Sequence, residues 1–265
     1  MPPDPLDIIK QISATHHAQP IEFHGDHAII DVAPPTVSGA PGPTYRLRIE
    51  QVGTTAIARE AEPALLPACC PERHINRDGS FCLYWHEVEE LAITDEEGGS
   101  LWMGKLLTFL RRQRIAASQR RWPAKSEARA HGAPAARQQS IAERAASDLG
   151  EKFKKLLDAS RLTTVRKSVG GERRIRLMQD GRRLVTVAEN GPRLMTKRAR
   201  CKCDAAARLR LPISGCSGHE AALTDLTLAL HRWEREEAKF YAAHTAKGTK
   251  CCGTMDDCPL RTEAA

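Results

Sequence analysis

One short segment of the chain combines residue types that could do covalent chemistry. Residues 74–83 read HINRDGSFCL. A cysteine thiol such as Cys82 can attack a thioester, and a nearby carboxamide such as that of Asn76 can donate a hydrogen bond to the oxyanion that forms. Asp78-Gly79 is a turn signal that would bring the two side chains together. The spacing therefore predicts a cysteine nucleophile and an oxyanion donor on one tight loop.

This segment resembles the active-site loop of ubiquitin-conjugating enzymes, where His-Pro-Asn precedes a short polar loop, a Gly, two residues, the thioester-forming Cys and a Leu. Five residues fall on that pattern: His74, Asn76, Gly79, Cys82 and Leu83. Ile75 replaces the usual Pro, the loop is shorter than in eukaryotic members, and Tyr84 stands where an Asp often follows. The segment most resembles the prokaryotic members encoded beside a ubiquitin-like protein, an activating enzyme and a deubiquitinase-like peptidase.

The resemblance implies a function for the first half of the chain. Cys82 would accept a ubiquitin-like protein from an activating enzyme as a thioester and transfer it to an acceptor protein. Asn76 would stabilise the oxyanion or hold the loop in shape, and His74 would brace the loop rather than act as a base. The implied setting is a bacterial operon that serves antiphage defence. The alternatives are an inactive binding module of the same fold and an unreactive, buried Cys82.

A second group of residues has the chemistry of metal ligands. Six cysteines and a histidine occur in the C-terminal part of the chain: Cys201, Cys203, Cys216, His219, Cys251, Cys252 and Cys258. Tetrahedral zinc takes four Cys or His ligands, often in two pairs. The first four residues make one candidate set, and Cys251 or Cys252 with Cys258 could replace either pair. The density predicts a structural zinc site, with unligated thiols as the alternative and no cofactor for catalysis.

The overall cysteine usage and the chain start indicate the compartment. The chain has nine cysteines, and it begins MPPDP without a basic leader or a long apolar run. We therefore expect a soluble, cytoplasmic protein without a membrane partner, in which cysteines are thiols or metal ligands rather than disulfides. The adjacent Cys69 and Cys70 are interpreted as free structural thiols, with a regulatory disulfide or a metal site as alternatives.

Charge is distributed unevenly along the chain, whose net charge is +7. Residues 86–97 hold six carboxylates and no Lys or Arg, whereas residues 161–210 hold fifteen Lys or Arg against four carboxylates. Such a field attracts an acidic partner, and one alternative function is therefore a nucleic-acid-binding zinc protein. A solvated charged face is the interpretation that we favour.

Sequence patterns predict an α+β protein with two modules. An antiparallel meander sheet with flanking helices, as in the ubiquitin-conjugating fold, is expected over residues 1–123. A linker and helix follow at 124–160, and a basic, Cys-rich module occupies 161–265. The 265 residues are long enough for such a division.

Individual elements follow from capping residues, periodicity and turn signals. A helix should begin at Asp4-Pro5, strands should lie in 20–32, 45–50 and 54–58, and a helix capped by Ser100 should end near Trp122. A further helix is expected to start near Ile141. Gly-containing turns at 170–171, 180–181 and 190–191 predict a small antiparallel sheet, followed by a last helix over 219–245.

Overall fold

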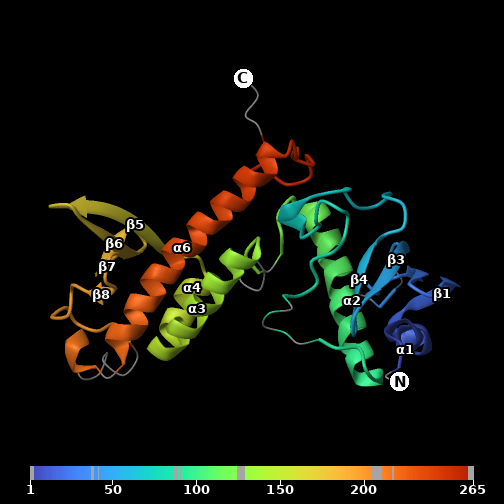
Figure 1. Cartoon of the computed structure of the whole chain (residues 1–265), viewed down its shortest axis with the longest axis horizontal. Coiled ribbons are helices and arrows are strands. Elements are labelled where there is room, and N and C mark those ends of the chain that lie inside the picture. The colour runs from blue at the N-terminus through green and yellow to red at the C-terminus, as the bar shows by residue number, and fades with distance from the viewer. Residues whose placement is uncertain are drawn as a thin grey trace. The chain divides into compact units, whose positions relative to one another are not determined.

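A computed structural model describes residues 3–36, 39–40, 42–85, 87, 89, 91–123, 129–203, 211–216 and 218–261 (Figure 1). The chain forms two compact units, one made of Met1–Pro123 with Thr245–Ala265, and the other of Ala124–His244. The protein is a mixed α+β protein with two antiparallel sheets. The C-terminal segment Thr245–Ala265 thus groups with the first unit, whereas we expected it to continue the module that begins at residue 161.

The first unit contains a four-stranded antiparallel meander in the order β1-β2-β3-β4 (Figure 1). Its strands are β1 (Ala18–Phe23), β2 (His27–Val32), β3 (Tyr45–Val52) and β4 (Thr55–Glu60). The single strand expected within 20–32 is wrong, because the chain reverses there and forms the β1-β2 hairpin. The amide of His24 donates to the carbonyl oxygen of His27 at 2.8 Å, which closes that turn.

Helix α1 (Pro5–Ile12) begins where the sequence predicted. The Asp4 side chain accepts a hydrogen bond from the Leu6 amide at 2.8 Å, and Pro5 occupies the first turn, where its missing N–H costs nothing. The apolar face of the helix is buried in the core, and the short 3₁₀ helix η1 (Ser13–His16) leads into the sheet.

Helix α2 (Glu96–Gln119) packs on this sheet, and the Trp102 indole N–H donates to the Ala56 carbonyl oxygen of β4 at 2.9 Å. The expected start at Ser100 is wrong. Asp95 caps the helix instead, accepting from the Gly98 amide at 2.8 Å, so the nearby carboxylates lie at the positive end of the helix dipole. Helix α2 also ends before Trp122, because Arg120 adopts the left-handed conformation.

The second unit combines helices with a second antiparallel sheet in the order β5-β6-β7-β8. Its helices are α3 (Ala133–Leu149), α4 (Glu151–Asp158), the 3₁₀ turn η4 (Ile213–Gly215) and α6 (His219–Ala246). The last two residues of α6 belong to the first unit. Helix α3 begins earlier than expected, and Gly150 at φ 105° separates it from α4. The predicted last helix is confirmed by α6.

The strands of this second sheet are β5 (Leu162–Val169), β6 (Glu172–Gln179), β7 (Arg182–Ala188) and β8 (Arg193–Leu194). Its turns are those that the sequence predicted, with positive φ at Gly170, Gly171, Asp180, Gly181 and Gly191.

Ion pairs neutralise part of the positive charge of this sheet. Basic side chains contact carboxylates in the pairs Arg161–Asp180, Arg166–Glu189, Arg174–Glu172 and Arg193–Glu172. Asp180 has a lowered pKa because the Arg161 guanidinium hydrogen-bonds to it. Within the part of the chain that is described, no helix has the length and apolar character needed to cross a membrane.

Candidate functional site

The segment around Cys82 follows the 3₁₀ turn η2 (Pro71–Arg73) and folds back on itself as a tight hairpin. Ile75 forms antiparallel bridges with both Cys70 and Phe81. The Phe81 amide donates to the Ala58 carbonyl oxygen of β4 at 2.8 Å, which attaches the hairpin to the first sheet. Ile75 and Phe81 are 1% and 6% exposed and belong to the hydrophobic core of this unit, so burial fixes the base of the loop.

Hydrogen bonds close the tip of this hairpin. The Asn76 amide donates to the Ser80 carbonyl oxygen at 2.8 Å, and Gly79 adopts φ 80°, a conformation that glycine reaches without steric cost. The Asp78 carboxylate accepts from the Ser80 amide at 3.0 Å and from the Ser80 hydroxyl at 2.6 Å. Burial acts to raise the pKa of Asp78, but these hydrogen bonds outweigh it and the pKa is lowered.

Cys82 follows directly after the hairpin, and the residue as a whole is exposed to solvent. Its amide donates to the His74 carbonyl oxygen at 2.9 Å. This bond joins the backbone of the cysteine to the start of the loop. The surrounding protein still limits hydration of the sulfur, and this desolvation raises the pKa of the Cys82 thiol. The residue is therefore exposed, but its thiol is largely protonated at neutral pH.

Asn76, the expected oxyanion donor, lies on the same hairpin and is exposed. Its Nδ2 donates to the Ser80 hydroxyl oxygen at 3.0 Å, so the carboxamide braces the turn in this structure. Ser80 receives this bond and donates to Asp78. Sequence reasoning missed Ser80 as a member of the site, although an Asp-Gly-Ser tripeptide is a recognised signal for a side chain that hydrogen-bonds within its own turn.

His74 is buried beside Cys82 and adopts the left-handed conformation at φ 54°. Its amide donates to the Pro71 carbonyl oxygen at 2.7 Å, and its ring lies 4.8 Å from the Trp122 ring, measured between centroids. The residue therefore connects the turn η2, the cysteine backbone and the aromatic core.

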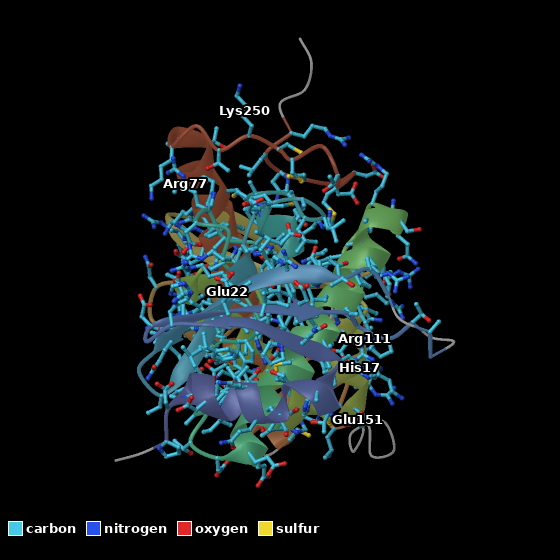
Figure 2. All side chains as sticks on the ribbon, turned by 90° about the vertical axis from the view of Figure 1, so that its right-hand side faces the viewer. His17, Glu22, Arg77, Arg111, Glu151 and Lys250 are labelled. Carbon is cyan, nitrogen blue, oxygen red and sulfur yellow. The ribbon has the colours of Figure 1, made fainter. Side chains whose placement is uncertain are left out.

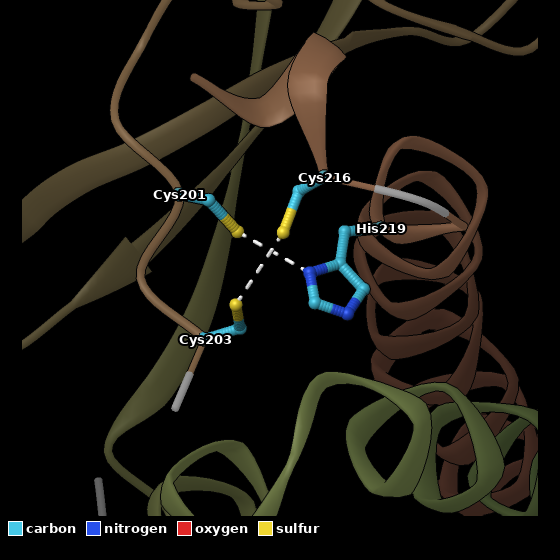
Figure 3. A group of neighbouring side chains, drawn as sticks. All are labelled: Cys201, Cys203, Cys216 and His219. Atoms are coloured by element: carbon cyan, nitrogen blue, oxygen red, sulfur yellow. Dashed lines mark hydrogen bonds between the residues drawn. The ribbon is translucent and has the colours of Figure 1, made fainter. Parts of the chain in front are cut away.

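Four side chains of the second unit converge as possible metal ligands (Figure 3). The sulfur and nitrogen atoms of Cys201, Cys203, Cys216 and His219 all lie within 4.8 Å of one another. Cys203 Sγ is 3.6 Å from Cys216 Sγ, and Cys201 Sγ is 3.4 Å from His219 Nδ1. Thiolates around one zinc ion are separated by about 3.8 Å, so this cluster could hold a metal ion such as zinc.

Two parts of the second unit supply these ligands. Cys201 and Cys203 follow β8, and the Cys201 amide donates to the Leu211 carbonyl oxygen at 2.9 Å. Cys216 follows η4, and His219 is the first residue of α6. Burial and the neighbouring thiols raise the pKa of Cys216 to about 12, so a bound cation would have to displace protons from this cluster.

The three remaining predicted metal ligands lie elsewhere. Cys251, Cys252 and Cys258 belong to the segment Thr245–Ala265, which groups with the first unit. Cys252 Sγ is 2.9 Å from the sulfur of Cys70, a residue that we expected to be a free structural thiol. The structure therefore separates the predicted metal ligands into two groups.

Two family descriptions match consecutive parts of the chain. Residues 16–124 match "Prokaryotic E2 domain", and residues 130–260 match "Cysteine-rich domain, C-terminal to E2 domain". No curated protein and no solved structure matches the chain. The first match contains the Cys82 hairpin, and the second contains the Cys201 cluster. Together the two matches are consistent with a bacterial E2-like family, in which an E2 domain precedes a cysteine-rich domain.

Proposed function

We propose that this protein is a ubiquitin-conjugating-like enzyme that carries a ubiquitin-like protein as a thioester on Cys82. The observation that carries the proposal is the exposure of Cys82 on a hydrogen-bonded hairpin inside the segment that matches a prokaryotic E2 domain. The four-stranded meander with α1 and α2 beside it is compatible with a ubiquitin-conjugating fold over residues 1–123. An activating enzyme and a ubiquitin-like protein would be its partners, and an acceptor protein its substrate.

The loading step is an exchange of thioesters. The Cys82 sulfur attacks the carbonyl carbon of the ubiquitin-like protein, which the activating enzyme holds as a thioester. A C–S bond to Cys82 forms, the C–S bond to the activating enzyme breaks, and the departing thiolate takes up the proton that Cys82 has lost. The transfer step forms a C–N bond to an acceptor amine and releases the Cys82 thiolate, which the amine proton neutralises.

The raised pKa of Cys82 suits a carrier of this kind. A thiol of high pKa is the stronger intrinsic nucleophile once deprotonated, and its thiolate is the poorer leaving group. The thioester on Cys82 would therefore resist hydrolysis by water. Transfer then requires an acceptor and a positioned oxyanion donor, a role that we assign to Asn76.

Within this proposal His74 positions the nucleophile. Its carbonyl oxygen accepts the Cys82 amide, and its ring is buried beside Trp122. A buried ring in this place is suited to holding the loop rather than to exchanging protons with an acceptor.

The experiment combines the protein with the activating enzyme and ubiquitin-like protein of its own gene neighbourhood and ATP, followed by non-reducing mass spectrometry. We expect the wild type to gain an adduct on Cys82 that thiols remove. Cys82→Ser should retain an adduct as an ester, which resists thiols and is cleaved by hydroxylamine.

Cys69→Ser is the matched control, because it removes a half-buried thiol near the same loop without touching Cys82. It should load like the wild type. A wild-type protein that forms no adduct, although the activating enzyme itself is charged, would contradict the carrier function and favour the inactive binding module or the nucleic-acid-binding zinc protein.

For the Cys201 cluster we propose a structural zinc ion held by Cys201, Cys203, Cys216 and His219. The chemistry of three sulfurs and one imidazole nitrogen is that of structural zinc sites. The ion would join the chain after β8 to the start of α6, and would take no part in thioester chemistry.

A further inference from the structure

Two thiols of the first unit that take no part in the functions proposed above lie in direct contact. Cys70 Sγ and Cys252 Sγ are 2.9 Å apart, closer than the 3.6 Å between the sulfurs of Cys203 and Cys216 in the Cys201 cluster. Both cysteines are free thiols in this structure. A disulfide bond is about 2.0 Å long, so a movement of about 1 Å would join two residues that are 182 positions apart in the sequence.

Hydrogen bonds hold the backbone on each side of this contact. Cys70 and Ile75 exchange two backbone hydrogen bonds, of 3.1 and 3.0 Å, at the base of the candidate active-site hairpin. On the other side, the Arg120 guanidinium at the end of α2 donates to the Gly253 carbonyl oxygen at 2.9 Å and to the Asp256 carboxylate at 2.6 Å. The two sulfurs therefore meet because both segments are anchored independently of the thiols themselves.

The two thiols differ in exposure and in polar surroundings. Cys70 is 1% exposed, whereas Cys252 is half-buried. Cys252 Sγ lies 3.0 Å from Thr254 Oγ1, an oxygen that also accepts a hydrogen bond from the buried Arg73 guanidinium at 3.4 Å. The Thr254 hydroxyl hydrogen is thus free to point at the sulfur, and a hydroxyl donor and a nearby cation both favour the thiolate, which is the reactive form. Cys252 is therefore the thiol that a small oxidant reaches first.

We propose that Cys70 and Cys252 form a reversible redox switch, which hydrogen peroxide oxidises to a disulfide and which small thiols reduce again by exchange. The Cys252 thiolate attacks a peroxide oxygen, so an S–O bond forms, the O–O bond breaks, and the departing hydroxide takes up the Cys252 proton as water. Cys70 then attacks the sulfur of this sulfenic acid, so an S–S bond forms, the S–O bond breaks, and a second water leaves with the Cys70 proton. The two sulfurs together lose two electrons, which reduce one hydrogen peroxide to two waters.

The position of the pair gives the switch a task. Cys70 directly precedes the turn η2, which leads into the candidate active-site hairpin. The C-terminal segment that carries the other thiol also accepts a hydrogen bond from the hairpin, at the Lys247 carbonyl oxygen from Arg77 Nη2 at 3.1 Å. Figure 2 labels Arg77 on the hairpin and Lys250 on this segment. A disulfide would add a covalent connection at the base of the hairpin and restrain it more tightly than in the reduced protein.

The experiment treats reduced full-length protein with hydrogen peroxide, blocks the remaining thiols and maps disulfides by non-reducing peptide mass spectrometry. We expect a species lighter by two hydrogens, in which the peptides of Cys70 and Cys252 are joined and which dithiothreitol reverses. Cys252→Ser should abolish this species. Cys70→Ser should abolish it as well, and should instead accumulate a sulfenic acid on Cys252 that a dimedone probe traps. Cys69→Ser, which alters the neighbouring thiol, should form the disulfide like the wild type.

Measurements on the wild type guard against variants that fail to fold. In hydrogen–deuterium exchange, the amides of Cys70 and Ile75, which pair with each other, should exchange several-fold more slowly in the oxidised protein. Cys82 should stay open to alkylation after one equivalent of peroxide, because desolvation raises its pKa and leaves little thiolate. Thr254→Val should slow disulfide formation several-fold, because it removes the hydroxyl beside Cys252.

Three results would overturn the proposal. One is a wild type that forms no Cys70–Cys252 disulfide in excess peroxide or oxidises Cys82 ahead of the pair. Another is a cross-link that persists in Cys70→Ser through Cys69. The last is equal exchange of the Cys70 and Ile75 amides in the two forms. Because none of these measurements depends on loading of Cys82, the redox switch and the carrier function can fail independently.

Discussion

Cys82 is an exposed residue whose thiol has a raised pKa, and this has a measurable consequence. Desolvation favours the protonated thiol, so the thiolate fraction at neutral pH is smaller than in a free cysteine. We predict that alkylation of Cys82 by iodoacetamide accelerates by about tenfold per pH unit from pH 7 and continues to rise beyond pH 9. Peptide-resolved mass spectrometry measures the rate at Cys82 alone.

An unstructured peptide with the same sequence is the reference, because its thiol has a pKa of about 8.5 and its rate should level off about one pH unit above that value, at lower pH than the rate of Cys82. A plateau for Cys82 below pH 8 would contradict the raised pKa and would point to a cation near the sulfur.

The Asn76 carboxamide has two possible tasks, oxyanion stabilisation and bracing of the turn through Ser80. Asn76→Ala removes both, whereas Ser80→Ala removes only the hydrogen bond at 3.0 Å between them. If Asn76 stabilises the oxyanion, Asn76→Ala should slow discharge of the Cys82 thioester to an amine by about 10²–10³-fold, as loss of such a donor does elsewhere.

Ser80→Ala should then slow the same discharge far less. Single-turnover discharge of preloaded protein measures both variants without the activating enzyme. Equal losses in the two variants would assign Asn76 to the shape of the loop.

Helix α2 is held close to its surroundings by two glycines near its N-terminus. A Cβ atom at Gly98 would lie 2.2 Å from the Ala92 carbonyl oxygen, and one at Gly99 would lie 2.7 Å from Ile8 Cγ2 of α1. The Gly98 contact is with backbone, which cannot rotate away. We predict that Gly98→Ala lowers the free energy of unfolding by about 1–3 kcal/mol, as overpacking does.

Gly104 lies in the same helix and serves as the matched control, because a Cβ atom added there would meet no neighbouring atom within 4 Å. Gly104→Ala should raise the free energy of unfolding by about 0.5–1 kcal/mol, because alanine loses less backbone entropy in a helix. Denaturant titration followed by circular dichroism compares the two. Equal effects in both variants would mean that the helix does not approach Ala92 closely.

At the scale of the whole chain, a metal ion in the Cys201 cluster would join segments that are separated in the sequence. The Cys201 cluster joins the segments that follow β8 and η4 to the start of α6, and Cys201 and Cys203 are part of the hydrophobic core of the second unit. We predict that Cys203→Ser, or chelation of the wild type, lowers the melting temperature by more than ordinary point mutations do, because structural zinc contributes directly to folding free energy.

Cys82→Ser is the control for this measurement, because it changes an exposed residue that lies outside both cysteine groups. It should leave the melting temperature nearly unchanged. A chelator that leaves the wild-type melting curve unaltered would refute a stabilising metal in the Cys201 cluster.

Local elements followed from the sequence where a few neighbouring residues determine the conformation. Asp4-Pro5 started α1, and the glycine turns at 170–171, 180–181 and 190–191 delimited the strands of the second sheet. The start of α2 did not follow, because Asp95 and Ser100 are both good capping residues and the close packing of Gly98 and Gly99 against Ala92 and α1 selects between them.

The candidate active-site hairpin was also readable from the sequence, since Asn76, Asp78 and Ser80 lie within one turn and their hydrogen bonds are local. The grouping of the cysteines was not. Cys70 and Cys252 are 182 positions apart, and no periodicity or turn signal relates them. Only the packing of Thr245–Ala265 with the first unit brings them together, because burial of distant segments in one core depends on shape complementarity across the whole unit.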